Sequence, residues 1–387
     1  MHALLAIAAL PVSAIVLAFL NWSALRPWRR SRNEHWTEQA RRLWPVNVTA
    51  HAAIWTMPPV AVLSLALFRP DTPQWSLFAT GVACLVGTMA GTLPLNREIF
   101  PRLGWSELLR QSAVGLCLHL LLWIVLAAVA LAMPSTFGWP ALALGVAMLA
   151  LQLSWARSGW LRFGRLLGLF VPAPERLQHI VDTVSARTGV QCRAVWVMRI
   201  GTCQALALPL SRELVFSDRL IEAMPDEEIA AICAHELGHL TESRVTLCLR
   251  LVRATSVLPW IYLIPLLHTL GAIGLYIPLL LMVLVPRLTA SLVRRLETCA
   301  DNMATANESV TGAYARALLR LSEDNLTPVV FPGKGVTHPH TYDRVLAAGV
   351  TPDFPRPKAP ATMSWHGFIL SGILGAELAC FAIQYLR

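Results

Sequence analysis

Residues 234–240, AHELGHL, contain two histidines four positions apart, with a glutamate directly after the first. On an α-helix, residues four apart lie on one face, so His235 and His239 can present two imidazoles to one metal ion. Glu236 lies one step around the helix and can reach a water molecule on that ion. Zinc held by three protein ligands activates such a water, and a neighbouring carboxylate then serves as general base. The motif is short and also occurs by chance in unrelated chains, so the rest of the sequence must decide.

A pair of acids further along the chain offers the third ligand. The sequence LETCAD places Glu297 and Asp301 four positions apart, and so on one face of a predicted helix. Glu297 can complete the zinc shell, while Asp301 can accept a hydrogen bond from a ligand histidine and fix its tautomer. Two acids on a solvated helix are common in proteins. Here the neighbouring residues are otherwise apolar or basic, which favours a site.

The composition indicates a membrane protein. Hydrophobic residues make up 55% of the 387 residues and charged residues 14%, and the mean hydropathy is +0.54. A helix of roughly 20 apolar residues crosses a bilayer. Such runs cover about 3–20, 51–68, 77–94, 112–132, 139–156 and 365–384, and a broken run over 256–286 is expected to form two spans with a turn near residue 270, or a shallow re-entrant hairpin.

The charge pattern predicts the orientation. The net charge is +9, and arginines gather after the first, third and fifth runs, whereas the alternate loops hold almost none. Positive residues stay on the cytoplasmic side, so the N-terminus is expected outside and the long polar segment after the fifth run inside. This basic balance is therefore a topology signal, and it does not indicate nucleic-acid binding. The near absence of lysine suggests a GC-rich bacterial genome.

Two polar stretches surround the predicted hairpin. In the first, about 158–253, residues 175–188 have helical spacing, residues 193–200, 204–210 and 213–217 are typical of short strands, and residues 224–240 begin as a helix with acids in the first turn. In the second, about 288–363, helices are predicted at 294–306 and 310–323, before a proline-rich segment. The zinc motif is thus expected on a helix that follows a small sheet.

These motifs together resemble the HtpX and CAAX-prenyl-protease family of integral-membrane zinc metallopeptidases. That family pairs H-E-x-x-H with a later E-x-x-x-D across a transmembrane hairpin, and adds a T-H-P-x-x-x-x-R signature, which appears here at 337–344. The resemblance covers about residues 172–350. It implies that His235, His239 and Glu297 bind zinc, that Glu236 is the base, and that Asp301 supports a ligand.

The resemblance also implies roles for less obvious residues. His338 and Arg344 would face the scissile carbonyl or steady the wall of the active site, and His338 is the expected oxyanion donor. The family carries an Asn-Ala pair in the edge strand before the catalytic helix, where this chain has Gln204 and Ala205. An extended substrate would pair with that strand, including Leu206, so the longer side chain bears on substrate selection.

The expected fold is a predominantly α polytopic membrane protein of about eight transmembrane helices with a small α+β zincin-type catalytic domain. The expected domains are a membrane part of five spans, a catalytic domain in two pieces around the hairpin, and a last helix. The membrane part covers 1–157 and the last helix 364–387. The two catalytic pieces cover 158–253 and 289–363, on either side of the hairpin at 254–288.

The expected function is zinc-dependent cleavage of membrane-protein or hydrophobic precursor substrates at the cytoplasmic face of the bacterial inner membrane. The sequence leaves the substrate and the oligomeric state open. One alternative is a transducer peptidase of the antibiotic-sensor type that cleaves a cytoplasmic repressor, although the alternate loops are short for a ligand-binding domain. Another is a membrane scaffold with a vestigial site, although none of the five core residues is missing.

Overall fold

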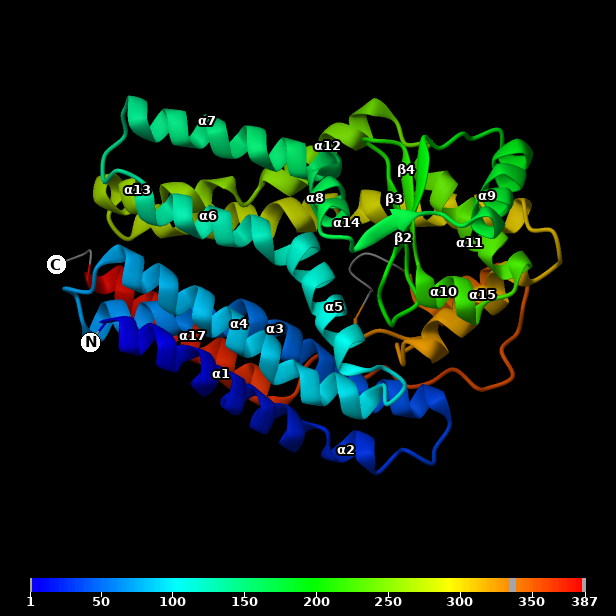
Figure 1. The fold of residues 1–387 in the computed structure, drawn as a ribbon, viewed down its shortest axis with the longest axis horizontal. Coiled ribbons are helices and arrows are strands. Elements are labelled where there is room, and N and C mark those ends of the chain that lie inside the picture. The colour runs from blue at the N-terminus through cyan, green and yellow to red at the C-terminus, as the bar shows by residue number, and fades with distance from the viewer. Residues whose placement is uncertain (1, 334–338, 385–387) are drawn as a thin grey trace.

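The computed structural model describes residues 2–333 and 339–384. It is mostly helical, with one four-stranded sheet, which confirms the predominantly α class with a small sheet (Figure 1). The membrane-type helices and their extensions are α1 His2–Ala24, α2 Arg26–Arg29, α3 Trp36–Phe68, α4 Gln74–Ile99, α5 Trp105–Gly115, α6 Leu121–Ala132, α7 Trp139–Ser154, α8 Trp160–Leu166, α12 Arg244–Thr255, α13 Leu263–Leu270, α14 Ile273–Ala306 and α17 Trp365–Gln384. The remaining elements are β1 Phe170–Pro172, α9 Glu175–Thr188, β2 Ala194–Met198, β3 Ala205–Leu208, β4 Glu213–Ser217, α10 Asp218–Ala223, α11 Asp226–His239, α15 Ala313–Asp324 and α16 Thr341–Ala347.

Seven helical segments of the described chain are long and apolar enough to cross a membrane. They are Leu4–Ala24, Trp36–Phe68, Gln74–Ile99, Trp105–Ala132, Trp139–Leu166, Arg244–Leu270 and Ile273–Ala306. The first five runs correspond to the first five segments, and the broken run over 256–286 is divided between the last two. The last run forms the shorter apolar helix α17. The expected number of about eight spans therefore stays a prediction.

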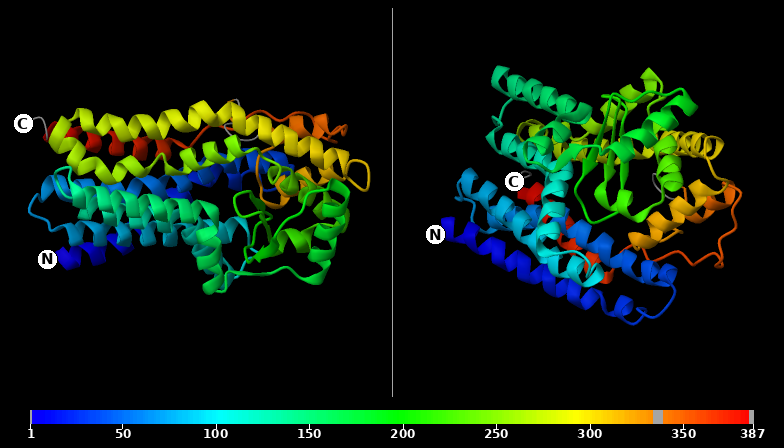
Figure 2. Two further views of the ribbon diagram at one scale, coloured as in Figure 1. Left: turned by 90° about the horizontal axis from the view of Figure 1, so that it is seen from above. Right: turned by 45° about the vertical axis from the view of Figure 1, so that its right-hand side comes forward.

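The long helices form two groups that lie side by side. Helices α1, α3, α4 and α17 pack on one another, and α6, α7, α13 and α14 form the second group (Figure 1). The sheet and its helices lie at one end of both groups (Figure 2). The beginning of α1 and the end of α17 lie at the opposite end, away from the sheet.

Helix α3 begins earlier than the apolar run that predicted it. The run starts near residue 51, but the helix starts at Trp36, with the His35 side chain accepting a hydrogen bond from the backbone N–H of Thr37. The added segment is amphipathic, since Ala40, Leu43 and Val46 are buried at helical spacing. A polar helix therefore extends the apolar one toward the sheet.

The hairpin turns where the sequence predicts it. Helix α13 ends at Leu270 and α14 begins at Ile273, with Gly271 between them at φ +60°, a backbone conformation that favours glycine. Helix α14 then continues without interruption from the hairpin to Ala306. The helix expected at 294–306 is thus the far end of the second hairpin helix, and the proposed boundary at residue 288 falls inside it.

The sheet has the order β1-β2-β4-β3. Strands β2 and β4 are parallel, and each outer strand is antiparallel to its neighbour. The three predicted strands all form, and β1 is an addition too short to show alternation in the sequence. In the described chain, β3 pairs only with β4, so one side of β3 is an edge.

The two faces of the sheet belong to different cores. Along β4, Leu214 and Phe216 face the core shared with α9, α11 and α15, while Val215 faces the core shared with Trp160 and Met198. This second core includes Val114, at the end of α5. The sheet is therefore held between α11 and the ends of the long apolar helices, which fixes the position of α11.

Asp324, at the end of α15, joins three segments of the chain. Its carboxylate accepts hydrogen bonds from Arg102 Nη2 at 2.7 Å and from Arg219 Nη2 at 2.5 Å, and the Cys203 thiol lies 3.2 Å away. Burial alone would raise the pKa of Asp324, but hydrogen bonds from Arg219 and Cys203, together with the two arginine charges, outweigh it and lower the pKa. The α4–α5 connection is thereby fastened to the segment before β3.

The Asp324→Asn variant is expected to unfold at a lower temperature than the parent near neutral pH. Removing the charge weakens the hydrogen bonds of this carboxylate to two partly exposed arginines, at a cost of about 1 kcal/mol. A carboxylate whose pKa is lowered by folding stabilises the fold at pH values above its unfolded pKa of about 3.9. That contribution is lost as the pH falls through the pKa of the folded state. The difference between the proteins should therefore shrink below about pH 4.

Thermal unfolding in detergent over a pH series measures this effect. Asp182→Asn is the control, because Asp182 is an exposed acid on α9 that accepts a hydrogen bond from the exposed Gln178. A parent–variant difference that stays constant as the pH falls would contradict the role given to Asp324.

Candidate metal centre

Helix α11 carries the zinc motif through the middle of the catalytic core. Residues 231–237 are all buried, so this helix is enclosed by α9, α14, α15 and β3. Three acids, Asp226, Glu227 and Glu228, occupy its first turn, where the helix dipole favours negative charge. The motif thus lies on a rigid element, as expected.

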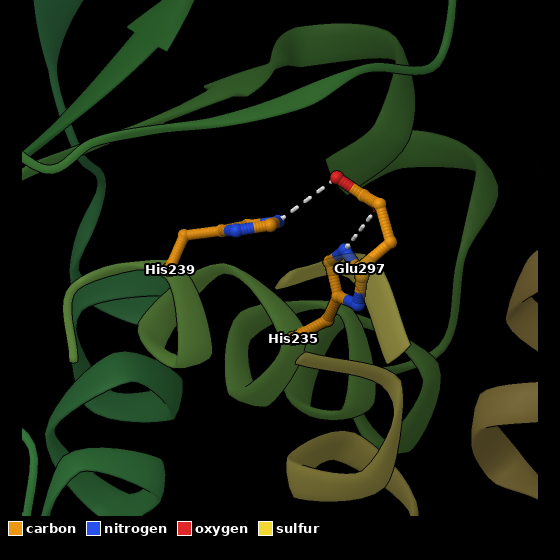
Figure 3. A group of neighbouring side chains, drawn as sticks. All are labelled: His235, His239 and Glu297. Atoms are coloured by element: carbon orange, nitrogen blue, oxygen red, sulfur yellow. Dashed lines mark ion pairs between the residues drawn. The ribbon is translucent and has the colours of Figure 1, made fainter. Parts of the chain in front are cut away.

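The structure brings His235, His239 and Glu297 together. Their donor atoms all lie within 4.8 Å of one another, and all three residues are buried. The two Nε2 atoms face the same carboxylate, at 3.7 Å from Glu297 Oε2 for His235 and 3.6 Å from Glu297 Oε1 for His239 (Figure 3). Two imidazoles from α11 and one carboxylate from α14 therefore converge on one point.

This donor set fits a catalytic zinc ion. Two neutral imidazole nitrogens and one carboxylate are a ligand set of zinc hydrolases, which keep a further position open for water. Ligand atoms of a tetrahedral zinc, with bonds of about 2.0–2.1 Å, lie roughly 3.3 Å apart. The distances from the two Nε2 atoms to the oxygens of Glu297, 3.7 and 3.6 Å, exceed this separation by only a few tenths of an ångström.

Gly238 allows the two helices to approach closely enough for this convergence. A Cβ atom at this position would lie 2.9 Å from the Cα of Ala300 and 3.2 Å from its Cβ. Glu297 lies one turn before Ala300 on α14. The absence of a side chain at residue 238 therefore lets Glu297 reach the two histidines.

The other ring nitrogen of His235 is held by a buried polar network. His235 Nδ1 lies 2.9 Å from the Tyr314 hydroxyl and 3.1 Å from Asp301 Oδ1. Tyr314 donates to Asp301 at 2.6 Å, and Arg344 donates to both. Burial raises the pKa of Tyr314 well above its ordinary value, so its hydroxyl keeps the proton that it donates. The network presents Nε2 of His235 to the metal position.

His239 has a carboxylate on its other nitrogen as well. Glu242 Oε1 lies 3.3 Å from His239 Nδ1, and Arg250 donates from Nε to Glu242 Oε2 at 2.5 Å. Burial alone would raise the pKa of Glu242, but the hydrogen bonds from His239 and Arg250 outweigh it and lower the pKa. Both histidines of the group are thus oriented through Nδ1.

Comparison with known families agrees with this geometry. Residues 172–349 match the model of peptidase family M48. Over these residues the chain is similar to peptidase family M48. That family contains the HtpX and CAAX prenyl protease zinc metallopeptidases, so the resemblance seen in the motifs is confirmed. No curated protein matches the chain.

Within residues 172–349, the predicted base lies on α11 and the predicted substrate-binding residues lie at the edge strand β3. Glu236 is buried on α11, between the two histidines in the chain. Ala205 and Leu206 lie in the edge strand β3, and Gln204 precedes it, with its backbone N–H donating to Ser217 Oγ and its carbonyl accepting from the Ser217 N–H. The Gln204 side chain is exposed.

The T-H-P signature is only partly described. His338 lies outside the described residues. Arg344, on α16, donates two hydrogen bonds to Asp301, from Nε at 2.9 Å and from Nη2 at 2.7 Å, and its side chain is 11% exposed. Of the two roles expected for Arg344, this position favours steadying the wall of the site.

Two residues of this M48 site, Tyr314 and Glu242, do not follow from the motif. Glu242 lies three positions after His239 but beyond the end of α11, so the helical spacing of the motif does not reach it. Tyr314 is brought to His235 only by the packing of α15 on α11.

The Tyr314→Phe variant is expected to bind zinc roughly 10-fold more weakly than the parent, because His235 Nδ1 loses one of its two oxygen partners and outer hydrogen bonds of this kind affect metal affinity by about 10–100-fold. Competition with a zinc chelator measures the affinity. Tyr342→Phe is the matched control, since Tyr342 packs on Phe354 rather than on the donor group. Equal affinities for both variants would exclude a role of the Tyr314 hydroxyl in orienting His235.

Proposed function

We propose that this chain is a zinc endopeptidase of the bacterial inner membrane that cleaves membrane-protein or hydrophobic precursor substrates at the cytoplasmic face. The observation that carries the proposal is the buried group of His235, His239 and Glu297 in the M48 part of the chain. The seven apolar helices support the membrane location. We assign the first five spans to a membrane domain and residues 158–253 and 289–363 to the peptidase.

The proposed mechanism gives each residue a task. His235, His239 and Glu297 would hold a zinc ion, which would supply Lewis acidity to lower the pKa of water and to polarise the scissile carbonyl. Glu236 accepts the proton of the attacking water and later passes it to the leaving amine. His338 is proposed as a donor to the developing oxyanion, as the family resemblance implies.

The supporting residues keep the histidines in the correct orientation. Asp301 and Tyr314 accept from His235 Nδ1, which leaves Nε2 free of its proton and able to bind the metal. Arg344 holds both of these groups in place. Its contacts favour a structural task over direct contact with the substrate.

Substrate binding is proposed at the edge strand β3. An extended peptide can pair with the open side of Ala205 and Leu206, as peptides commonly add a strand to a sheet edge. Gln204 has an exposed side chain at the start of this strand and can contact a substrate residue. The sheet lies at one end of the long apolar helices. This position favours substrates that are themselves anchored in the bilayer or associated with it.

The orientation is proposed from charge. The arginine-rich segments after the first, third and fifth runs place the N-terminus outside and the peptidase inside. The structure agrees with this arrangement, since the beginning of α1 and the sheet lie at opposite ends of the helices.

Zinc content and cleavage measured on the same preparation test the proposal. The full-length protein, purified in detergent, is expected to contain about one zinc ion per chain by elemental analysis and to cleave an unfolded membrane protein. Chelation should abolish cleavage, and added zinc should restore it. A protein that holds no zinc and cleaves nothing, with or without added zinc, would favour a membrane scaffold with a vestigial site.

A further inference from the structure

The two histidines of the donor group have matching surroundings. His235 Nδ1 faces Asp301, and Arg344 grips that carboxylate with two nitrogens. His239 Nδ1 faces Glu242, and Arg250 grips that carboxylate with two nitrogens in the same way. The first arrangement uses residues of the family motifs. In the second, Glu242 and Arg250 lie outside every motif identified in the sequence.

The chain fixes Glu242 tightly in this position. Helix α11 ends at His239, and the Thr241 N–H and hydroxyl both bond to the carbonyl of Gly238. Ser243 then caps α12 by accepting from the N–H of Thr246. Glu242 lies between the two helices, so the hydrogen bonds on either side restrict its backbone. Its side chain lies next to the His239 ring.

The burial of Glu242 requires partners. Its side chain is only 2% exposed, and a buried carboxylate is costly unless it is paired and hydrogen-bonded. Arg250 provides one partner, with its Nε at 2.5 Å from Oε2 and its Nη2 in contact with Oε1. His239 Nδ1, at 3.3 Å, provides the other. Since His239 Nε2 faces Glu297, the two carboxylates lie on opposite sides of one ring.

We propose that Glu242 is a positioning residue for His239, which it orients toward the metal, and that Arg250 holds Glu242 in place. The inference rests on the proposed function of the zinc group and adds a second carboxylate–histidine pair to it. Arg250 lies on α12, the first segment of the hairpin. The pair therefore connects His239 directly to the helix that leaves the catalytic part for the membrane.

The same helix offers a matched control. Glu228, in the first turn of α11, is also only 2% exposed and accepts hydrogen bonds from Arg320 at 2.7 and 3.1 Å, and its ion-pair partners are arginines rather than a histidine. Glu228→Ala and Glu242→Ala thus each remove a buried carboxylate from a partly exposed arginine. They differ in whether that carboxylate touches the donor group.

Zinc affinity of the full-length protein in detergent, measured by competition with a chelator, tests the proposal. Glu242→Ala is expected to weaken zinc binding about 10–100-fold, the effect typical of removing a partner of a metal-bound histidine. Glu228→Ala should bind zinc as tightly as the parent. Glu242→Gln, which retains an acceptor oxygen, should lose less zinc affinity than Glu242→Ala. Arg250→Met should weaken binding in the same direction, and less than additively with Glu242→Ala.

The outcomes separate this inference from the proposed function. If the parent binds zinc but the two alanine variants bind it equally well, or are weakened equally, Glu242 is a structural residue only and the inference is wrong. If Glu242→Ala fails to fold, the Glu242→Gln and Arg250→Met variants decide, and parental zinc affinity in both would also overturn it. A parent that binds no zinc would overturn the proposed function together with this inference.

Discussion

The Glu236→Gln variant is expected to lose peptide hydrolysis and to keep its zinc. Glutamine has the shape of glutamate but cannot accept the proton of the attacking water, and general base catalysis contributes about 10²–10⁴-fold to such reactions. Glu236 is 8% exposed, so the isosteric change disturbs the surrounding packing little. We expect kcat to fall by at least about 10²-fold while KM changes little.

Parallel measurement of cleavage rate and zinc content checks this prediction. Glu227→Gln is the control, because Glu227 lies in the first turn of the same helix, away from the donors. If Glu236→Gln cleaves at the parental rate, another group must be the base. If it loses zinc together with activity, Glu236 supports the metal rather than the proton transfer.

The Glu297→Ala variant is expected to lose zinc altogether under conditions that saturate the parent. Glu297 supplies the only carboxylate in the donor group, and two imidazoles alone leave the ion with too few protein ligands. The affinity should fall by more than the roughly 10–100-fold that an outer partner costs. Hydrolysis should disappear with the metal.

Elemental analysis after dialysis and chelator competition measure this effect. Thr298→Ala is the control, since Thr298 is the exposed neighbour of Glu297 on α14. The unfolding temperatures of the metal-free proteins should be similar, because a carboxylate beside two histidines contributes little packing. Retention of zinc at parental affinity would show that the third ligand lies elsewhere.

Regular geometry explains why the donors could be predicted from the sequence. Each of the two motifs places its residues four apart on a helix, and this spacing alone sets which side chains share a face. Apolar run length likewise predicted the apolar part of each of the seven long helical segments in the described chain. These features depend on neighbours in the chain, and the sequence contains them.

The supporting residues depend on packing that the motifs do not specify. Tyr314 reaches the donor group only because α15 lies against α11, from a distant part of the chain. Arg250 lies nearer, on the helix that follows the turn after α11, where it donates to Glu242. The early start of α3 could have been predicted from the helical spacing of Ala40, Leu43 and Val46. A search for long apolar runs misses this segment, because polar residues lie between them. Strand β1 has only three residues and ends in proline, so its pairing with β2 is fixed by position rather than by sequence.

The separation of the donors along the chain bears on how the protein is made. Chains emerge from the ribosome from the N-terminus, and their parts fold as they appear. Helix α11 is therefore synthesised before the hairpin, and Glu297 follows only after α13 and most of α14. A nascent chain that ends before Glu297 has two histidines and no third ligand. The proposed metal site is therefore incomplete until the hairpin and most of α14 have been made, so the proposed proteolysis is not expected from the unfinished chain.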